Sequence, residues 1–343
     1  MVDPYSFFTK TTKVYSLPSQ RKSKLLICGN SFSDRWGRCG LLPVSSFKGE
    51  LKRFALRFLC ATGMMPSRLG KAEKEILDSL VENKGQEWNV SACIIRGNEA
   101  FAKNTLLITD QHHHPVGYLK YVEKLSDQKN LENEYRCLSI LPPGIAPKVI
   151  KYGLYNSGTI LFTQPIPGRV FNISKGDTIK ADQFLRKMKT VERSCDFMKH
   201  PWIMKLKKRT GDALDWAGVL TKQNWSVVIF HGDFVPWNLF ETENGKIVAI
   251  DWEYGDCEGF PYIDKIYYAL QVDALIRRLT PQEAFLHAQK GIMDFDHSIP
   301  ADTAKALIGL TALYGIWQRK EDQFFSGDYV YDWRTEVFEI ARN

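Results

Sequence analysis

One stretch in the C-terminal half constrains this chain more than any other. It reads HGDFVPWNLF at 231–240 and is followed by IDWE at 250–253. The first segment holds a carboxylate, Asp233, and an amide, Asn238, five residues apart, and the second segment adds the carboxylate of Asp251. Clustered carboxylates at the ends of apolar segments are typical of functional sites.

The apolar segments around these polar residues predict how they come together. The run from Val227 to Phe230 predicts a buried strand. Leu239 and Phe240, the Asn244-Gly245 pair and the run from Ile247 to Ile250 predict a tight hairpin. We therefore expect Asp233, Asn238 and Asp251 to converge at one edge.

This arrangement suits phosphoryl transfer, in which a protein positions a hydroxyl nucleophile and neutralises the charge of the transferred group with a divalent metal. In such a site Asp233 would accept the hydroxyl proton. Asn238 would offer its carbonyl oxygen to Mg²⁺, and Asp251 would offer a carboxylate that links the metal to the β- and γ-phosphates.

The same segments resemble the catalytic loop and the metal-binding loop of the aminoglycoside phosphotransferase and choline kinase family, which are relatives of protein kinases. The resemblance spans about residues 91–343 and is densest at 227–268. It implies an α+β, two-lobed protein-kinase-like fold, with a small antiparallel-sheet N-lobe and a mainly helical C-lobe, and it implies ATP and Mg²⁺ as cofactors. Asp264 stands where the family has a further, structural aspartate, and His231 is expected to pack the loop.

The N-lobe is expected to begin with antiparallel strands over Ser91–Ile95, Thr105–Thr109 and Val116–Tyr121. The resemblance implies that Lys120, on the last of these strands, binds the α- and β-phosphates. The next stretch has helical spacing and ends at a Pro-Pro-Gly sequence. Glu134 on this helix would pair with Lys120, and Glu132 is the alternative partner.

Two loops of the expected N-lobe need a separate interpretation. The segment 96–104, in the position of a nucleotide-binding loop, contains a single glycine, so its backbone has less freedom to approach phosphates. The run His112-His113-His114 is expected to be a solvated turn, because adjacent histidines point in different directions and a metal site needs convergent ligands.

A strand over Thr159–Thr163 leads into the sequence QPIPG at 164–168. The resemblance implies that this is the hinge between the lobes, with the backbone of Gln164 and Ile166 hydrogen-bonding adenine. Beyond it, apolar residues at helical spacing predict a helix from Ile179 through Lys199.

Composition agrees with a large cytoplasmic enzyme. The 343 residues are 44% hydrophobic, enough to bury a sizeable core, and we expect a basic extension at 1–90, an N-lobe at 91–165 and a C-lobe at 166–343. No apolar run is long enough to span a membrane, and residues 1–13 lack the apolar core of a signal peptide. The seven cysteines are scattered and suggest neither a zinc site nor a disulfide framework.

The extension carries all of the net charge. Residues 1–90 contain 15 lysines and arginines against 8 aspartates and glutamates, and the whole chain has a net charge of +7. Within 47–60, phenylalanines and leucines at helical spacing alternate with basic residues, which predicts a basic amphipathic helix. We expect its apolar stripe to pack on the rest of the chain; the alternative is peripheral contact with an anionic membrane. A second short helix is expected over 71–82.

Two features bear on the acceptor of the phosphoryl group. Gly232 replaces the arginine with which protein kinases sense a phosphorylated activation loop, and the chain from Asp251 to Ile263 is too short for a peptide platform. We therefore expect a small-molecule hydroxyl, on an aminoglycoside, an amino alcohol, or a sugar or glycolipid precursor, and no nucleic acid. Aromatic and acidic residues interleave over 314–336, mostly as core and partly able to stack on sugar rings. The alternative function is a catalytically silent nucleotide-binding or scaffolding module on the same fold.

Overall fold

The computed structural model describes residues 3–19, 24–39, 41, 47–72, 88–96, 103–171, 178–188 and 193–343. Contacts divide the chain into two compact units. The first comprises Met1–Tyr135 and Pro147–Pro165, and the second comprises Arg136–Ala146 and Ile166–Asn343. The domain limits expected from the sequence, with a separate extension at 1–90, stay a prediction.

The first unit is built on strands, with α3 continuing into the second unit. Its elements are η1 (Pro4–Phe7), β1 (Lys13–Leu17), β2 (Leu25–Cys28), α1 (Phe32–Cys39), α2 (Phe47–Ala61), β3 (Ser67–Leu69), β4 (Trp88–Arg96), β5 (Lys103–Asp110), β6 (Pro115–Val122), α3 (Leu125–Ile140), β7 (Val149–Tyr155) and β8 (Gly158–Thr163).

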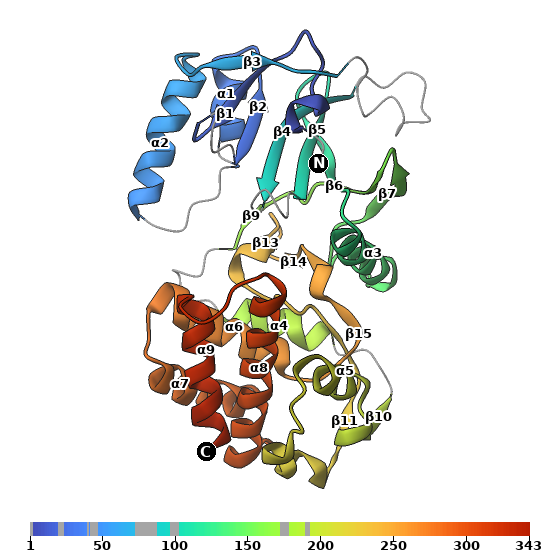
Figure 1. Cartoon of the computed structure of the whole chain (residues 1–343), viewed down its shortest axis with the longest axis vertical. Helices are drawn as coiled ribbons and strands as arrows, with labels where there is room; N and C mark the ends of the chain where they lie inside the picture. Colours follow the sequence, from blue (N-terminus) through green and yellow to red (C-terminus); the bar gives the residue numbers. More distant parts are fainter. Residues whose placement is uncertain are drawn as a thin grey trace. The chain divides into compact units, whose positions relative to one another are not determined.

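The strands form an eight-stranded antiparallel sheet in the order β3-β1-β2-β4-β5-β6-β8-β7 (Figure 1). The strands expected at Ser91–Ile95, Thr105–Thr109, Val116–Tyr121 and Thr159–Thr163 are confirmed as parts of β4, β5, β6 and β8. Pairing of β2 with β4 carries the sheet into residues 1–90, which the sequence did not indicate. The helix expected over 71–82 lies almost entirely outside the described residues.

Side chains alternate between the two faces of this sheet, as the period of a strand requires. Val14 and Leu26 lie in one core cluster, whereas their neighbours Tyr15 and Ile27 lie in another. This second cluster also contains Cys39 from α1 and Cys60 from α2. The two helices thus help to bury one face of the sheet, which explains why both strands are apolar throughout.

The amphipathic helix expected over 47–60 is confirmed as α2, but the expected packing of its aromatic stripe is wrong for the described side chains. Phe54 is 58% exposed and Phe58 is 51% exposed. The side of α2 that packs is formed by Leu56 and Cys60. The sequence pattern could not distinguish these two sides, because both carry apolar residues.

The second unit combines short strands with long helices. Its elements are β9 (Arg169–Val170), α4 (Thr178–Lys187), β10 (Ser194–Asp196), η4 (Phe197–Lys199), α5 (Pro201–Thr210), η5 (Asp215–Lys222), β11 (Asn224–Ser226), β12 (Val228–Phe230), η6 (Pro236–Asn238), β13 (Leu239–Glu241), β14 (Ile247–Ala249), η7 (Trp252–Tyr254), β15 (Asp256–Gly259), α6 (Ile263–Val272), η8 (Asp273–Arg277), α7 (Pro281–Phe295), α8 (Ala301–Glu321) and α9 (Tyr329–Arg342).

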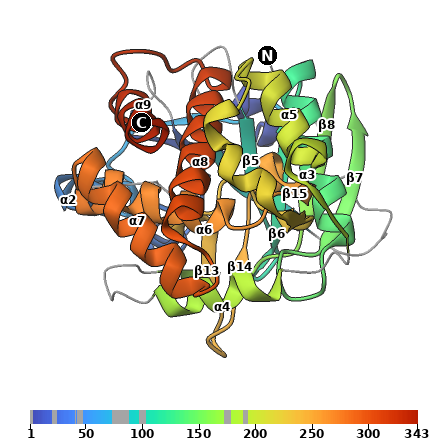
Figure 2. The same ribbon diagram turned by 90° about the horizontal axis from the view of Figure 1, so that it is seen from below.

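Helix α8 is the centre of this unit. It contacts α5, η5, α6, α7 and α9, and Figure 2 shows it running among these helices. Most of its length is buried, from Thr303 through Ile316. A helix that is apolar on nearly all sides must be surrounded by other elements, so α8 organises the core against which the segment 231–255 can be held.

The helix expected from Ile179 through Lys199 is confirmed as far as Lys187 and is wrong at Ser194–Asp196, while residues 189–192 lie outside the described residues. Helix α4 ends at Lys187, and Ser194–Asp196 forms strand β10, in which Cys195 pairs with Trp225 of β11. Strand pairing therefore overrides apolar spacing that also fits a helix. Among the described residues, no helix combines the length and the apolar character that crossing a membrane requires.

The packing of β6 generates a test of the sheet. A Cβ atom on Gly117 would lie 2.3 Å from the carbonyl oxygen of Thr163 and 2.6 Å from the ring of Phe162. Gly117→Ala should therefore lower the free energy of unfolding by about 2 kcal/mol or more, because β6 would have to move away from β8. Gly153→Ala in β7 is the matched control, since a Cβ there would meet nothing within 4 Å. Equal urea midpoints for the two variants would contradict this packing.

Candidate active site

The segment that holds Asp233, Asn238 and Asp251 begins where β12 ends. Strand β12 pairs with β15, placing Val228 opposite Gly259 and Phe230 opposite Asp256. The expected hairpin is confirmed as β13 and β14, in which Leu239 pairs with Ala249. The residues between these strands, at 231–238 and 250–255, form two loops that we call the first loop and the second loop.

A buried carboxylate fixes the start of the first loop. Asp264, in the first turn of α6, is 6% exposed and accepts the backbone N–H of His231 at 2.7 Å and that of Gly232 at 3.0 Å. Burial raises the pKa of Asp264 to about 7, although these two hydrogen bonds act in the opposite direction. The residue thus has the structural position that the sequence resemblance implied.

Gly232 is held from the other side as well. Its carbonyl oxygen accepts hydrogen bonds from the hydroxyl of Tyr314 at 3.2 Å and from the amide of Gln318 at 2.7 Å, both on α8. Its φ of +82° is in the left-handed region, and a Cβ would lie 2.3 Å from the carbonyl oxygen of Tyr254. Glycine is therefore required here by conformation and by close approach of the second loop.

His231 joins the two loops. It is completely buried; its Nε2 lies 2.9 Å from the carbonyl oxygen of Ile250, and its Nδ1 accepts the backbone N–H of Asp233 at 3.2 Å. A carbonyl can only accept, so Nε2 carries the proton and the imidazole is neutral. Both nitrogens are engaged in holding backbone, as expected for a residue that packs the loop.

Asp233 carries the one carboxyl group of the first loop, and the pKa of this group is shifted. The side-chain amide of Asn238 donates to its Oδ2 at 2.9 Å and to its backbone carbonyl at 3.1 Å, and the hydroxyl of Tyr267 also donates to the carboxylate. Burial, followed by the negative charge of Asp251, raises the pKa of Asp233 to about 6. Asp233, Asn238 and Asp251 are therefore brought together, as expected from the sequence.

Asp251 sits in a conformation that non-glycine residues seldom adopt. Its φ is +67°, a region that aspartate tolerates better than most residues but at a cost in free energy. The next residue, Trp252, is completely buried and donates its indole N–H to the carbonyl oxygen of Ala249 at 2.9 Å. Its ring lies 4.5 Å from that of His231, so packing around Trp252 stabilises the strained aspartate.

A buried arginine lies behind Asp233, and the sequence analysis missed it. Arg334 of α9 is 2% exposed, donates to the carbonyl oxygen of Gly315 at 2.7 Å and lies 4.7 Å from the centre of the Tyr267 ring. Its positive charge opposes the rise in the pKa of Asp233. Neighbouring apolar residues at helical spacing could reveal that this face of α9 is buried, but not which loop the arginine approaches.

In the first unit, Lys120 forms the expected ion pair. Its Nζ lies 2.8 and 2.6 Å from the carboxylate oxygens of Glu134, whose side chain is only 4% exposed. Glu132, the alternative partner, is exposed. A lysine on a central strand held by both oxygens of a buried carboxylate is fixed in position far better than a surface ion pair.

The other expected site residues of the N-lobe are less constrained. The backbone N–H of Gln164 donates to the carbonyl oxygen of Lys148 at 2.8 Å. Ile166 is partly buried. Residues 97–102 of the glycine-poor loop lie outside the described residues.

The three adjacent histidines have different surroundings. His113 lies 3.2 Å from the guanidinium of Arg38, whereas His114 lies 3.5 Å from the carboxylate of Asp110. Within the described ranges, no group of three or more histidine, cysteine, aspartate or glutamate side chains is arranged to hold a metal ion.

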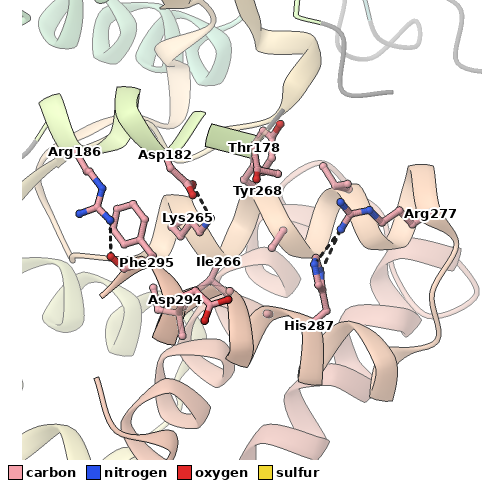
Figure 3. A pocket seen from close by; sticks show the side chains of 15 residues that line it. Thr178, Asp182, Arg186, Lys265, Ile266, Tyr268, Arg277, His287, Asp294 and Phe295 are labelled. Carbon is pink, nitrogen blue, oxygen red and sulfur yellow. Dashed lines mark hydrogen bonds and ion pairs between the residues drawn. The ribbon is translucent and has the colours of Figure 1, made fainter. Parts of the chain in front are cut away.

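A separate hollow of about 260 Å³ lies among α4, α6 and α7 (Figure 3). Its charged side chains bind one another: Lys265 lies 2.6 Å from the carboxylate of Asp182, and Arg277 donates to the ring of His287 at 3.2 Å. Among the described residues that line it, none is a candidate site residue. The hollow therefore does not belong to the two loops.

Comparison with solved structures identifies the fold. A thermostable mutant of aminoglycoside phosphotransferase APH(4)-Ia, in a ternary complex with ADP and hygromycin B, is 13% identical with a TM-score of 0.50, covering 78% of this chain and 98% of that chain. The apo form of such a mutant is 14% identical with a TM-score of 0.46, covering 74% and 95%. WbdD, crystallised with a kinase inhibitor, is 16% identical with a TM-score of 0.31, covering 72% and 49%.

The first of these likenesses confirms the expected α+β, protein-kinase-like fold of the aminoglycoside phosphotransferases. At this level of identity it concerns the fold alone. No protein-family model matches the chain, and no curated protein matches its sequence.

The raised pKa of Asp233 predicts how this site affects stability. The folded-state pKa of about 6 exceeds the value of about 3.9 in unfolded chains, so ionisation of Asp233 opposes folding. This cost is absent below about pH 4 and complete above about pH 6. Without metal, Asp233→Asn should therefore be more stable than the parent protein by about 1–2 kcal/mol at pH 8, allowing for a weakened hydrogen bond to Asn238.

Thermal unfolding in a chelator, at several pH values between 4 and 8, measures this difference. The gain should shrink steadily as the pH falls from 6 toward 4. A gain that does not depend on pH would mean that the carboxyl of Asp233 titrates normally.

Proposed function

We propose that this chain transfers the γ-phosphoryl group of ATP, with Mg²⁺, to a hydroxyl group of a small molecule. One observation carries the proposal. The side-chain amide nitrogen of Asn238 donates to the carboxylate of Asp233 at 2.9 Å, while the backbone carbonyl of Asn238 accepts the backbone N–H of Ile250, the residue before Asp251, at 2.9 Å. A base and two oxygen ligands are thereby combined within a protein-kinase-like fold.

In this proposal Asp233 is the base that accepts the proton of the acceptor hydroxyl. A pKa of about 6 leaves the carboxylate ionised at neutral pH and makes it a stronger base than an ordinary aspartate. The hydrogen bonds from Asn238 and Tyr267 fix the orientation of the carboxylate. A hydroxyl bound beside it is thereby held in position for transfer.

Asn238 and Asp251 suit the coordination chemistry of Mg²⁺. The Asn238 amide nitrogen is directed at two oxygens of Asp233, which leaves its side-chain carbonyl oxygen for a metal. Asp251 supplies a carboxylate oxygen, and Mg²⁺ prefers such hard ligands with its remaining positions filled by water and substrate phosphates. The ion would neutralise charge on the phosphates during transfer.

Lys120 and Glu134 would bind the nucleotide from the first unit. Glu134 holds the Lys120 ammonium by both carboxylate oxygens, so the lysine can meet the α- and β-phosphates with little loss of conformational freedom. The carbonyl of Gln164 and the backbone of Ile166 would contact adenine. The ADP bound to the APH(4)-Ia mutant supports a nucleotide as the ligand of this fold.

The acceptor would lie near the connection between α8 and α9. There Phe324 and Phe325 are 43% and 58% exposed, whereas Tyr314 and Trp333 of the same aromatic series are buried. Asp322 accepts the hydroxyl of Tyr254, from the second loop, at 2.8 Å. Exposed rings beside a carboxylate suit a sugar or an amine, which fits an aminoglycoside, an amino alcohol, or a sugar or glycolipid precursor.

The alternative, a catalytically silent nucleotide-binding or scaffolding module, is favoured by one feature. The segment 96–104 contains a single glycine, so its backbone N–H groups have less conformational freedom to approach phosphates than those of a glycine-rich loop. The two functions differ in turnover, because a silent module binds nucleotide without transferring the phosphoryl group to the hydroxyl of any acceptor.

Nucleotide binding is tested by thermal unfolding. Mg²⁺-ATP at a hundredfold excess over Kd should stabilise the protein by about 2.7 kcal/mol, because it binds the folded state alone. Lys120→Ala and Glu134→Gln should each reduce this stabilisation. Lys71→Ala, which removes an exposed lysine paired with Asp3, should not. If millimolar nucleotide leaves the parent midpoint unchanged, the nucleotide site is wrongly assigned.

A coupled assay with amines, sugars and amino alcohols as candidate acceptors tests catalysis. Two substitutions should lower activity in different ways. Asp233→Asn removes the base and should lower kcat by about 100- to 10,000-fold at any Mg²⁺ concentration. Asp251→Asn removes a metal ligand, so its activity should need more Mg²⁺ and recover in part when Mg²⁺ is raised. Full activity of Asp233→Asn would exclude this residue as the base.

A further inference from the structure

The first unit presents a group of apolar side chains, mostly aromatic and mostly exposed, outside the proposed catalytic machinery. We call the side chains of Phe32, Trp36, Phe54, Phe58 and Leu59 the aromatic face. Phe32 of α1 is 50% exposed, and Phe54, Phe58 and Leu59 of α2 are 58%, 51% and 41% exposed. Single exposed apolar residues are ordinary, but a contiguous group of this kind marks an interaction surface.

Contacts between the rings join three members of the aromatic face. Phe32 stacks on Trp36 with ring centres 5.9 Å apart, and Trp36 meets Phe54 edge-on at 5.5 Å. Phe58 follows Phe54 by four residues and therefore lies on the same side of α2. Leu56 and Cys60 pack inward with the sheet core, so the helix cannot rotate to bury its rings without exposing these residues.

Basic side chains accompany the rings. The guanidinium of Arg57 lies 4.4 Å from the centre of the Trp36 ring and donates to the Trp36 carbonyl oxygen at 3.1 Å. Helix α2 also includes Lys48, Lys52 and Arg53 against one acidic residue, Glu50. Moreover, residues 1–90 carry the whole net charge of +7, and residues 91–343 are neutral overall.

We propose that the aromatic face docks on the surface of an anionic lipid membrane. The aromatic rings would enter the boundary between headgroups and acyl chains, while Arg53 and Arg57 of α2 would meet the lipid phosphates. Arginine and lysine have long apolar stems, so their charged groups can reach the headgroups beside inserted rings. The charge of residues 1–90 complements such a surface, which attracts basic segments over about a Debye length.

Vesicle sedimentation with the full chain tests this proposal. At about 50 mM salt, the protein should bind vesicles that contain about 30% phosphatidylglycerol in phosphatidylcholine, and should not bind phosphatidylcholine alone. Binding should fall about tenfold or more at about 500 mM salt, because screening weakens the basic contribution. A protein that sediments equally with both kinds of vesicle would overturn the anionic part of the proposal.

The double variant Phe54→Ser with Phe58→Ser isolates the rings. Its affinity for anionic vesicles should be lower by about tenfold or more, because two apolar side chains no longer enter the lipid. Its thermal midpoint should stay close to that of the parent, since both rings are already more than half exposed. The matched control is Leu154→Ser with Leu286→Ser, which removes exposed leucines from β7 and α7 and should bind like the parent.

Three results would overturn the proposal. If the Phe54→Ser, Phe58→Ser variant bound vesicles as well as the parent, the aromatic face would not be the part of the protein that contacts the membrane. Absence of binding by the parent, together with a large fall in the thermal midpoint of this variant, would mean that the chain itself covers the rings. Absence of vesicle binding with a concentration-dependent dimer that the variant abolishes, measured by light scattering, would assign the face to a second copy.

Discussion

The geometry of the two loops depends on one buried carboxylate. Asp264 is fixed by the first turn of α6, and its oxygens accept the backbone N–H groups of His231 and Gly232. Pairing of β12 does not reach these two N–H groups, because the strand ends at Phe230. With the backbone held in this way, the imidazole of His231 reaches both Asp233 and Ile250. A single acidic residue thus determines where the proposed base and the second loop meet.

Holding carboxylates together has an electrostatic cost, and the helices of the second unit offset part of it. Asp233 and Asp264 both have raised pKa values, caused first by burial. Tyr267 donates to Asp233 and also lies against the buried guanidinium of Arg334. This cation favours the ionised form of Asp233 from a position where solvent cannot screen it. Helix α9 therefore contributes to the electrostatics of a loop about a hundred residues earlier.

The sequence predicted the parts of this molecule that are determined locally. Apolar segments and turn residues correctly predicted β5, β6, β8 and the β13–β14 hairpin. The positions of Asp233, Asn238 and Asp251 at the ends of these segments correctly predicted that the three residues lie together. It could not predict that Tyr314 and Gln318 bind the carbonyl of Gly232, because helical spacing gives burial without naming the contact. It also misjudged Ser194–Asp196, where a partner strand thirty residues away decides the conformation.

The N-terminal residues were difficult for a different physical reason. In β1 and β2, successive side chains are buried on both faces of the sheet, so the alternation that reveals a half-exposed strand is missing. In α2, apolar residues occupy both the packed side and the solvent side, so spacing alone cannot select the face that is buried. Leu56 and Cys60 pack with the core, whereas the larger rings of Phe54 and Phe58 are more than half exposed. A helix that buries its smaller residues and exposes its larger ones gains little stability from those rings, so their position is better explained by contact with another surface than by folding.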